Sequence, residues 1–167
     1  QGPIEMFSGA ALAGVSRIVQ VSALGVTESG GDEHPPYITS KREADRALAA
    51  LPVSHAVVRP SLVYGPGSAS ASLFATLASL PVISLPGAGT QRVQPIHVYE
   101  VAEAIARWIE CKESKSGVFE LAGPKAVAYR DMLAAYREAM SLGAALWLPL
   151  PMVLMHVGAM LAEHLPQ

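Results

Sequence analysis

The chain has 167 residues, 51% of them hydrophobic and 16% charged, and its formal net charge at pH 7 is −2. This length suits one domain with a sizeable core, and the charge gives no basic surface for nucleic acid, so we expect no nucleic-acid partner. The single cysteine, Cys111, excludes an intrachain disulfide and a thiolate metal cluster. The five histidines lack the close spacing of a zinc site, so we predict no metal site.

No basic-then-apolar signal peptide opens the chain, and the longest apolar run, residues 144–162, is interrupted by Pro149 and Pro151. We therefore expect a cytoplasmic protein without a membrane-spanning helix. Peripheral attachment to a membrane is left open.

The first third of the chain alternates helices and strands. We predict a helix over 3–14 with Gly14 as its C-cap, a strand over 17–22 buried on both faces, a loop over 23–36, a helix over 37–51 with alternating charges on its outer face, and a strand over 55–59. This order and spacing are typical of a doubly wound parallel sheet, in the α/β class.

The rest of the chain continues with shorter elements. We predict a turn-rich segment over 60–67, a helix over 70–80, a strand over 82–85, a turn over 86–89, extended chain over 92–96, a helix over 98–111, a strand over 118–121, a helix over 129–140, extended chain over 146–148 and an apolar helix over 152–164. Ligands bind outside the carboxyl ends of parallel strands, so the segments after Ser22 and Arg59 should face one crevice.

Tyr37 and Lys41 are the first candidates for chemistry, because a spacing of four places both side chains on one helical face. A lysine ammonium near a phenol favours the phenolate, which makes tyrosine a usable proton donor or acceptor. The alternative is a surface helix that carries the two residues incidentally.

Five motifs follow one another in an order that resembles a known superfamily. They are Val-Ser-Ala-Leu-Gly at 21–25, Tyr-x-x-Ser-Lys at 37–41, Val-Val-Arg-Pro-Ser-Leu-Val-Tyr-Gly-Pro-Gly at 57–67, Gln-Pro-Ile-His-Val at 94–98 and Phe-Glu-Leu-Ala-Gly-Pro at 119–124. Together they resemble the extended and atypical short-chain dehydrogenases/reductases, the NAD-dependent epimerase/dehydratase superfamily. Within it, the first and fourth motifs are most similar to the branch of the nucleotide-binding accessory subunit of respiratory complex I and its bacterial relatives.

The resemblance implies the C-terminal half of a Rossmann-like, doubly wound parallel sheet with a small, mostly helical substrate-side region. Residues 1–66 would be the second half of the NAD(P)-binding domain, and 67–167 the substrate side, with about 98–123 returning to the sheet. The sequence has no Gly-x-x-Gly-x-x-Gly or Gly-x-Gly-x-x-Gly turn, so we expect the adenosine side of the site to lie upstream of Gln1. The implied cofactor is NAD or NADP.

The resemblance also assigns roles to individual residues. Tyr37 would donate or accept a proton, and Lys41 would assist it and bind the nicotinamide ribose. Ser22 lies near the position of the third catalytic group, a hydroxyl that polarises the substrate, although relatives usually have it one or two residues later. Ser22 could instead satisfy the backbone at the strand end.

Further cofactor contacts would come from the segment that lies along the nicotinamide, chiefly through its backbone. Its candidate residues are Arg59, Pro60, Ser61 and Val63. Arg59 is also a candidate for a structural ion pair at the strand end. For His97 and Glu100, at the start of a helix, a capping and packing role is favoured.

Two functions remain open from the sequence. The first is an NAD(P)-dependent oxidoreductase or epimerase-like enzyme acting on a small molecule of unknown identity. The second is a non-catalytic NADP(H)-binding protein that supports a membrane or quinone-linked complex. Homo-oligomerisation is left open in both.

Overall fold

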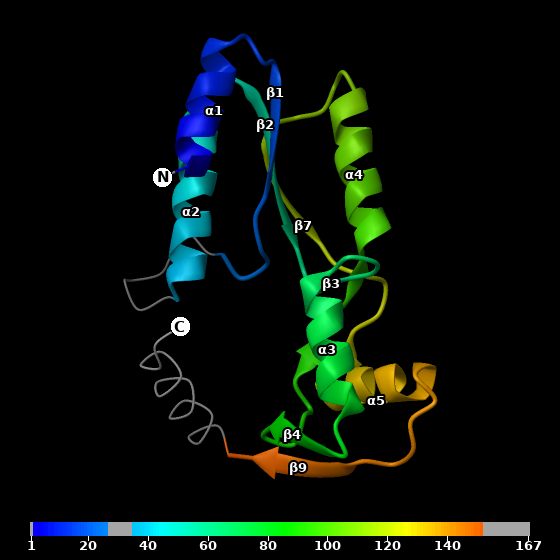
Figure 1. Cartoon of the computed structure of the whole chain (residues 1–167). Helices are drawn as coiled ribbons and strands as arrows, with labels where there is room; N and C mark the ends of the chain where they lie inside the picture. The colour runs from blue at the N-terminus through cyan, green and yellow to red at the C-terminus, as the bar shows by residue number, and fades with distance from the viewer. Residues whose placement is uncertain (1, 27–34, 152–167) are drawn as a thin grey trace. The chain divides into compact units, whose positions relative to one another are not determined.

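The chain forms two compact units in a computed structural model that describes residues 2–26 and 35–151 (Figure 1). Unit 1 comprises Gln1–Gly65 and Pro95–Pro124, and unit 2 comprises Pro66–Gln94 and Lys125–Gln167. The apolar helix predicted over 152–164 lies outside the described residues.

Unit 1 is built on a parallel three-stranded sheet. Its strands are β1 (Arg17–Val21), β2 (Ser54–Pro60) and β7 (Gly117–Leu121), in the order β1-β2-β7. Val21 pairs with Val58, and Pro60 pairs with Leu121. All three strands run in one direction, so their carboxyl ends lie at one edge of the sheet, as the helix-strand alternation predicted.

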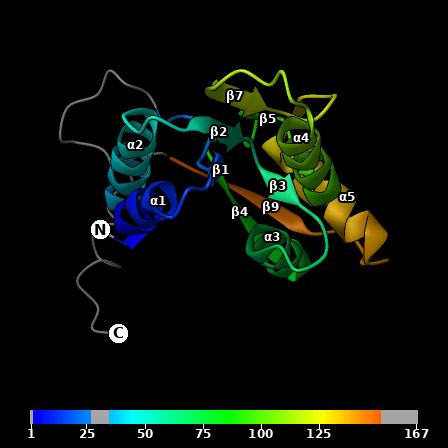
Figure 2. The same ribbon diagram turned by 90° about the horizontal axis from the view of Figure 1, so that it is seen from above.

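Helices cover both faces of this sheet, which makes three layers (Figures 1 and 2). α1 (Gly2–Leu12) and α2 (Pro36–Ala49) lie on one face, and α4 (Val98–Glu110) lies on the other. Successive side chains of β2 point to opposite faces of the sheet, so the strand contributes to two hydrophobic clusters. Phe7, Ile18, Ala44, Leu48 and Val57 form the first cluster, and Ala56, Val58, Ile96 and Val101 form the second. Each fully buried aliphatic side chain contributes about 1.5–3 kcal/mol through removal from water.

β1 differs from its prediction as a strand buried on both faces. Only Ile18 is buried in it, and Val21 is 43% exposed. The β-branched run specifies a strand, but its burial depends on its neighbours, and β1 is an edge strand of the described sheet. A second difference concerns α2, where Arg42 and Asp45 are buried instead of lying on the outer face.

Two capping predictions are confirmed. After α1, Gly14 adopts a left-handed φ of 82°, which glycine reaches without steric cost, and its N–H donates to the Ala11 carbonyl at 3.1 Å. At the start of α4, the Glu100 carboxylate accepts from the His97 N–H at 3.0 Å, while His97 Nδ1 accepts from the Tyr99 N–H at 3.3 Å.

The segment over 60–67, predicted as turns, also contains a short strand. β3 (Val63–Tyr64) pairs in parallel with β6 (Ile96–His97), immediately before α4. Gly65 follows with a φ of 134°, and a side chain there would collide with Val98. This ladder fixes the chain where it leaves the end of β2.

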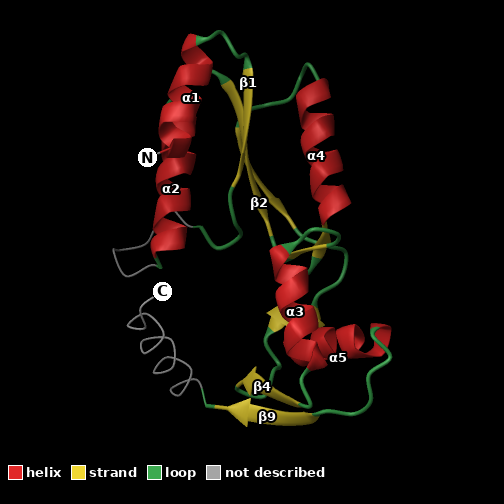
Figure 3. Cartoon of the chain, viewed as in Figure 1, coloured by secondary structure: helices red, strands yellow, loops and turns green. Residues whose placement is uncertain are grey.

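Unit 2 combines two helices with two short sheets (Figure 3). α3 (Ala69–Ser79) packs on α5 (Tyr129–Ala139), with the Phe74 ring centroid 6.1 Å from that of Tyr129. β4 (Val82–Pro86) pairs in parallel with β9 (Leu146–Leu150), and β5 (Arg92–Val93) pairs antiparallel with β8 (Val127–Ala128). In the described part of this unit the two helices hold more residues than the four strands, in line with the expected mostly helical region.

Within residues 2–26 and 35–151, none of the helices has the length and apolar character needed to cross a membrane.

Candidate functional site

Tyr37 and Lys41 lie on successive turns at the start of α2, beside the carboxyl end of β1. Pro35 and Pro36 begin this helix, because the proline ring presets the backbone for a first turn. The Lys41 ammonium donates to the Val21 carbonyl at 2.9 Å and lies 5.8 Å from the centroid of the Tyr37 ring. Tyr37 is 58% exposed. The chain thus presents a phenol and an ammonium together at the edge where parallel strands bind ligands.

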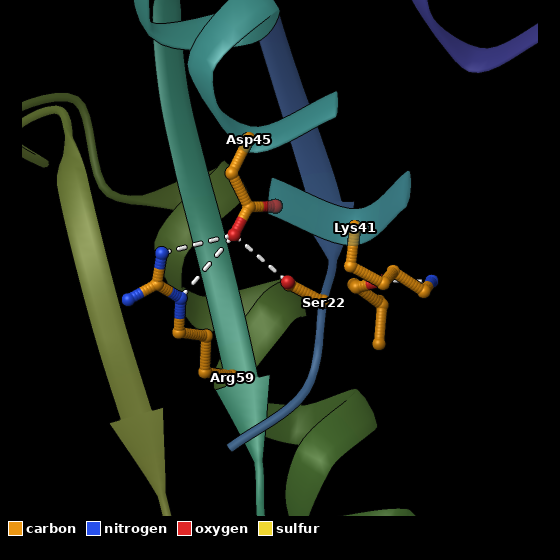
Figure 4. Close-up of polar contacts among 5 residues, drawn as sticks. Ser22, Lys41, Asp45 and Arg59 are labelled. Atoms are coloured by element: carbon orange, nitrogen blue, oxygen red, sulfur yellow. Dashed lines mark hydrogen bonds and ion pairs between the residues drawn. The ribbon is translucent and has the colours of Figure 1, made fainter. Parts of the chain in front are cut away.

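A buried polar cluster lies one turn further along α2 (Figure 4). Asp45 Oδ2 accepts from the Ser22 hydroxyl at 2.8 Å and from Arg59 Nε and Nη2 at 3.2 and 3.0 Å. Exposure is 4% for Ser22, 3% for Asp45 and 7% for Arg59. The other carboxylate oxygen, Oδ1, has no hydrogen-bond partner among the described residues. One carboxylate therefore connects α2 to the ends of both β1 and β2.

This cluster gives Ser22 a partner that the sequence did not suggest. Its hydroxyl donates to Asp45, and its N–H donates to the Val58 carbonyl at 2.7 Å. The catalytic role of Ser22 stays a prediction, and the observed bond directs its proton into the protein interior. For Arg59, the ion pair at the strand end is confirmed, and its partner is Asp45.

Asp45 is the residue that sequence reasoning missed. Its signal was available, because Asp45 follows Tyr37 and Lys41 at the same spacing of four and shares their side of the helix. Ala44 and Leu48, which flank it, are buried against the sheet. A carboxylate placed between such residues needs a buried partner, which Arg59 supplies.

The remaining predicted cofactor contacts lie where β2 ends. The Pro60 carbonyl accepts from the Leu24 N–H at 3.0 Å, and the Ser61 N–H donates to the Leu121 carbonyl at 2.7 Å. Val63 is half-buried within β3. These backbone groups hold the strand ends together, and contact with a nicotinamide through this segment stays a prediction.

A groove of about 460 Å³ opens beside the polar cluster, between α2 and the strands β2 and β7. Its lining residues are Asp45, Arg46, Ala49, Ala50, His55, Val57, Arg59, Gly117 and Val118. Within the described residues, no group of three or more His, Cys, Asp or Glu side chains is arranged to hold a metal ion.

The sequence also matches a known protein family, in agreement with this fold. Residues 1–122, most of the chain, match the NAD dependent epimerase/dehydratase family. The chain belongs to this family. The resemblance drawn from the five motifs is thereby confirmed at the level of the superfamily.

The chain is also similar to a curated relative and to solved structures. The ceramide reductase of Caulobacter vibrioides is 32% identical over 121 residues, which is 72% of this chain and 36% of that protein. MoeE5, solved with UDP-glucuronic acid and NAD, superimposes with a TM-score of 0.69 at 24% identity, covering 89% of this chain and 55% of its own. The UDP-glucose 4-epimerase of Thermus thermophilus, solved with NAD, gives 0.67 at 22% identity, with coverages of 90% and 56%.

These structural likenesses confirm the predicted Rossmann-like α/β fold. The chain spans about a third of the curated relative and just over half of the solved structures.

The donors at the carboxyl edge fit the ribose and nicotinamide part of a dinucleotide, which is the cofactor that the family's name implies. An ammonium carries three N–H donors, and the bond from Lys41 to Val21 uses one of them. The remaining donors and the exposed Tyr37 phenol suit ribose hydroxyls and a substrate oxygen. The sequence contains neither of the Gly-x-x-Gly-x-x-Gly and Gly-x-Gly-x-x-Gly motifs that bind the diphosphate.

Proposed function

We propose that the protein is an NAD(P)-dependent oxidoreductase or epimerase/dehydratase of the short-chain dehydrogenase/reductase type. The observation that carries this proposal is the placement of the Lys41 ammonium on the Val21 carbonyl, with the exposed Tyr37 phenol one turn before it. In this proposal unit 1 serves the cofactor and unit 2 serves the substrate.

The chemistry divides between the protein and its cofactor. A bound nicotinamide dinucleotide supplies or accepts the hydride. Tyr37 holds the proton at its phenolic oxygen and passes it to, or takes it from, the substrate oxygen. Lys41 would orient the cofactor's ribose through the N–H donors that Val21 does not use. Membership of the NAD dependent family and the NAD in the structures of MoeE5 and the Thermus epimerase support a nicotinamide cofactor. We leave NAD and NADP as alternatives.

Two substrate classes follow from the relatives. The similarity to ceramide reductase favours a ceramide-like lipid carbonyl, and the solved structures favour nucleotide-linked sugars.

Within the family, the Val-Ser-Ala-Leu-Gly and Gln-Pro motifs support a place near the branch of the complex I accessory subunit.

A second function is favoured by one observation, the burial of the Ser22 hydroxyl in its bond to Asp45. Without a free hydroxyl there, the protein could bind NADP(H) without turning over a substrate, and support a membrane or quinone-linked complex. As part of this second function, we also propose that the protein is cytoplasmic, attaches peripherally to a membrane and associates with itself.

Hydride transfer by the whole protein separates the two functions. Nicotinamide absorbance is followed with a ceramide-type ketone and with UDP-glucose, and cofactor binding is measured in parallel by calorimetry. We expect Tyr37→Phe to lower kcat about 100-fold or more while cofactor binding remains. Tyr99→Phe is the matched control, because Tyr99 lies on α4 and is 67% exposed.

Equal turnover by the wild type and Tyr37→Phe would overturn the assigned role of Tyr37. Cofactor binding without turnover in either protein would instead support the non-catalytic function.

A further inference from the structure

The polar residues along α2 form a line that reaches from the exposed pair into the core. Tyr37, Lys41 and Asp45 follow one another at intervals of four, so their side chains lie along one side of the helix. Exposure falls along this line, since Tyr37 is 58% exposed, Lys41 is half-buried and Asp45 is 3% exposed. Asp45, at the buried end of the line, is therefore the residue most enclosed by the protein.

Two successive turns of α2 hold two successive residues of the chain leaving β1. Lys41 donates to the carbonyl of Val21, and Asp45 accepts from the hydroxyl of Ser22. Figure 4 shows Lys41 and Asp45 one turn apart on α2, with Ser22 below them. A shift of α2 along or around its axis would break both bonds together, so each bond restricts the geometry of the other.

Arg59 extends this coupling to the next strand. Its guanidinium donates twice to the same oxygen of Asp45, and both groups are buried. A buried carboxylate requires a compensating charge, and Arg59 satisfies that requirement at the end of β2. Asp45 thus fixes α2 against two strand ends at the edge where the candidate pair lies.

We propose that Asp45 is a positioning residue for the Tyr37/Lys41 pair, and that Ser22 acts through Asp45 instead of touching the substrate. This inference rests on the proposed function for its kinetic consequence, but the placement of Lys41 is measurable without cofactor or substrate. The Asp45 carboxylate sets the position of α2, and α2 sets where the Lys41 ammonium and the Tyr37 phenol are presented.

The first test measures the environment of Lys41 directly. Lysines of the whole protein are labelled by reductive methylation under native conditions, and the labelling rate of each lysine is followed by peptide mass spectrometry. Asp45→Asn keeps the volume of the side chain but removes the charge that faces Arg59. We expect Lys41 to label severalfold faster in Asp45→Asn, while the exposed Lys112 and Lys125 keep their wild-type rates. An unchanged circular dichroism spectrum shows that the fold persists.

Ser22→Ala provides a milder variant that keeps the ion pair. It removes one hydrogen bond to Asp45, and we expect a smaller increase of Lys41 labelling in the same direction. Glu103→Gln is the matched control, because Glu103 is an exposed carboxylate that pairs with Arg107 on α4. It should leave the Lys41 rate unchanged.

The second test is kinetic. With a substrate in hand, we expect Asp45→Asn to lower kcat roughly 10- to 100-fold, as misplacement of reacting groups does. Ser22→Ala should lower kcat less, in proportion to its effect on Lys41 labelling.

The outcomes distinguish the two proposals. Unchanged Lys41 labelling in both Asp45→Asn and Ser22→Ala overturns the positioning role, whatever the turnover. A large loss of kcat in Ser22→Ala with unchanged Lys41 labelling also overturns it, because Ser22 would then act on the substrate. Faster Lys41 labelling in a protein without turnover supports the positioning role. That result contradicts only the proposed enzymatic function. If Asp45→Asn does not fold, the Ser22→Ala result decides.

Discussion

Arg17 connects the start of β1 to the end of α4, and its replacement is the most informative test of unit 1. Its guanidinium donates to four backbone carbonyls: those of Trp108 at 3.1 Å, Ile109 at 2.6 Å, Cys111 at 2.7 Å and Lys112 at 3.1 Å. It also lies 5.6 Å from the centroid of the Trp108 ring. The last carbonyls of a helix have no partner within the helix, so Arg17 caps α4 from another element.

The size of this contribution follows from the contacts. A hydrogen bond to a charged group contributes about 1.5–3 kcal/mol where it is buried, and a cation at a helix C-terminus adds about 0.3–1 kcal/mol. The four bonds share one half-buried guanidinium and lie mostly near solvent, so we do not add them separately. We expect Arg17→Met to lower the free energy of unfolding by about 2 kcal/mol. Arg17→Lys should cost about half as much, because an ammonium keeps the charge but not the planar fork.

Equilibrium unfolding in urea, followed by Trp108 fluorescence, measures this difference. Trp147 lies in unit 2, so Trp147→Phe serves as the background in which only Trp108 reports. Arg107→Met is the matched control, because Arg107 lies in the last turn of α4 and forms an exposed pair with Glu103. Such pairs contribute about 0.5 kcal/mol or less. An Arg17→Met effect no larger than that of Arg107→Met would refute the capping argument.

Two further predictions concern the core and the single thiol. Leu48→Ala should lower the free energy of unfolding by about 2–5 kcal/mol, measured in urea, because Leu48 is fully buried in the cluster beneath α2. The Ser114 hydroxyl, which bonds the Cys111 sulfur, is the main cause that lowers the pKa of that thiol. Ser114→Ala should therefore raise the pKa of Cys111, and the midpoint of iodoacetamide alkylation against pH should move to higher pH. An unchanged midpoint would contradict this assignment.

The helices and longer strands were predictable because each repeats one local pattern over several residues. α4 shows the helical apolar period clearly, and Val101 on that period is buried against the sheet. β3 was not predicted, and only Ile96 of β6 fell within the extended chain predicted over 92–96, because two residues are too few to show a period. Their pairing joins segments about 30 residues apart, and that depends on the packed fold rather than on local preference.

Of the candidate site, the sequence predicted the Tyr37/Lys41 pair but not the Asp45 partner of Ser22. The Tyr37/Lys41 spacing fixed a shared helical face, and the two side chains do lie together. Predicting the partner of Ser22 would have required knowing which residues of α2 face the sheet. A polar residue such as Asp45 carries no apolar signal, so a pattern of charges assigned it to the outer face. Its buried neighbours Ala44 and Leu48 hold the information that the charge pattern lacked.

The arrangement at the end of β1 bears on which reaction to expect. The Ser22 hydroxyl donates its hydrogen bond to Asp45, and the next two residues, Ala23 and Leu24, have no exchangeable side-chain proton. Among the described side chains at this strand end, the Tyr37/Lys41 pair then carries the protons that a substrate could use. Interconversion of a ketone and an alcohol needs one proton for one hydride, whereas dehydration also needs a proton taken from carbon and one delivered to the departing hydroxyl. The ketone–alcohol step proposed for the Tyr37/Lys41 pair therefore needs no proton donor beyond that pair, and a ceramide-type ketone is the first substrate to assay.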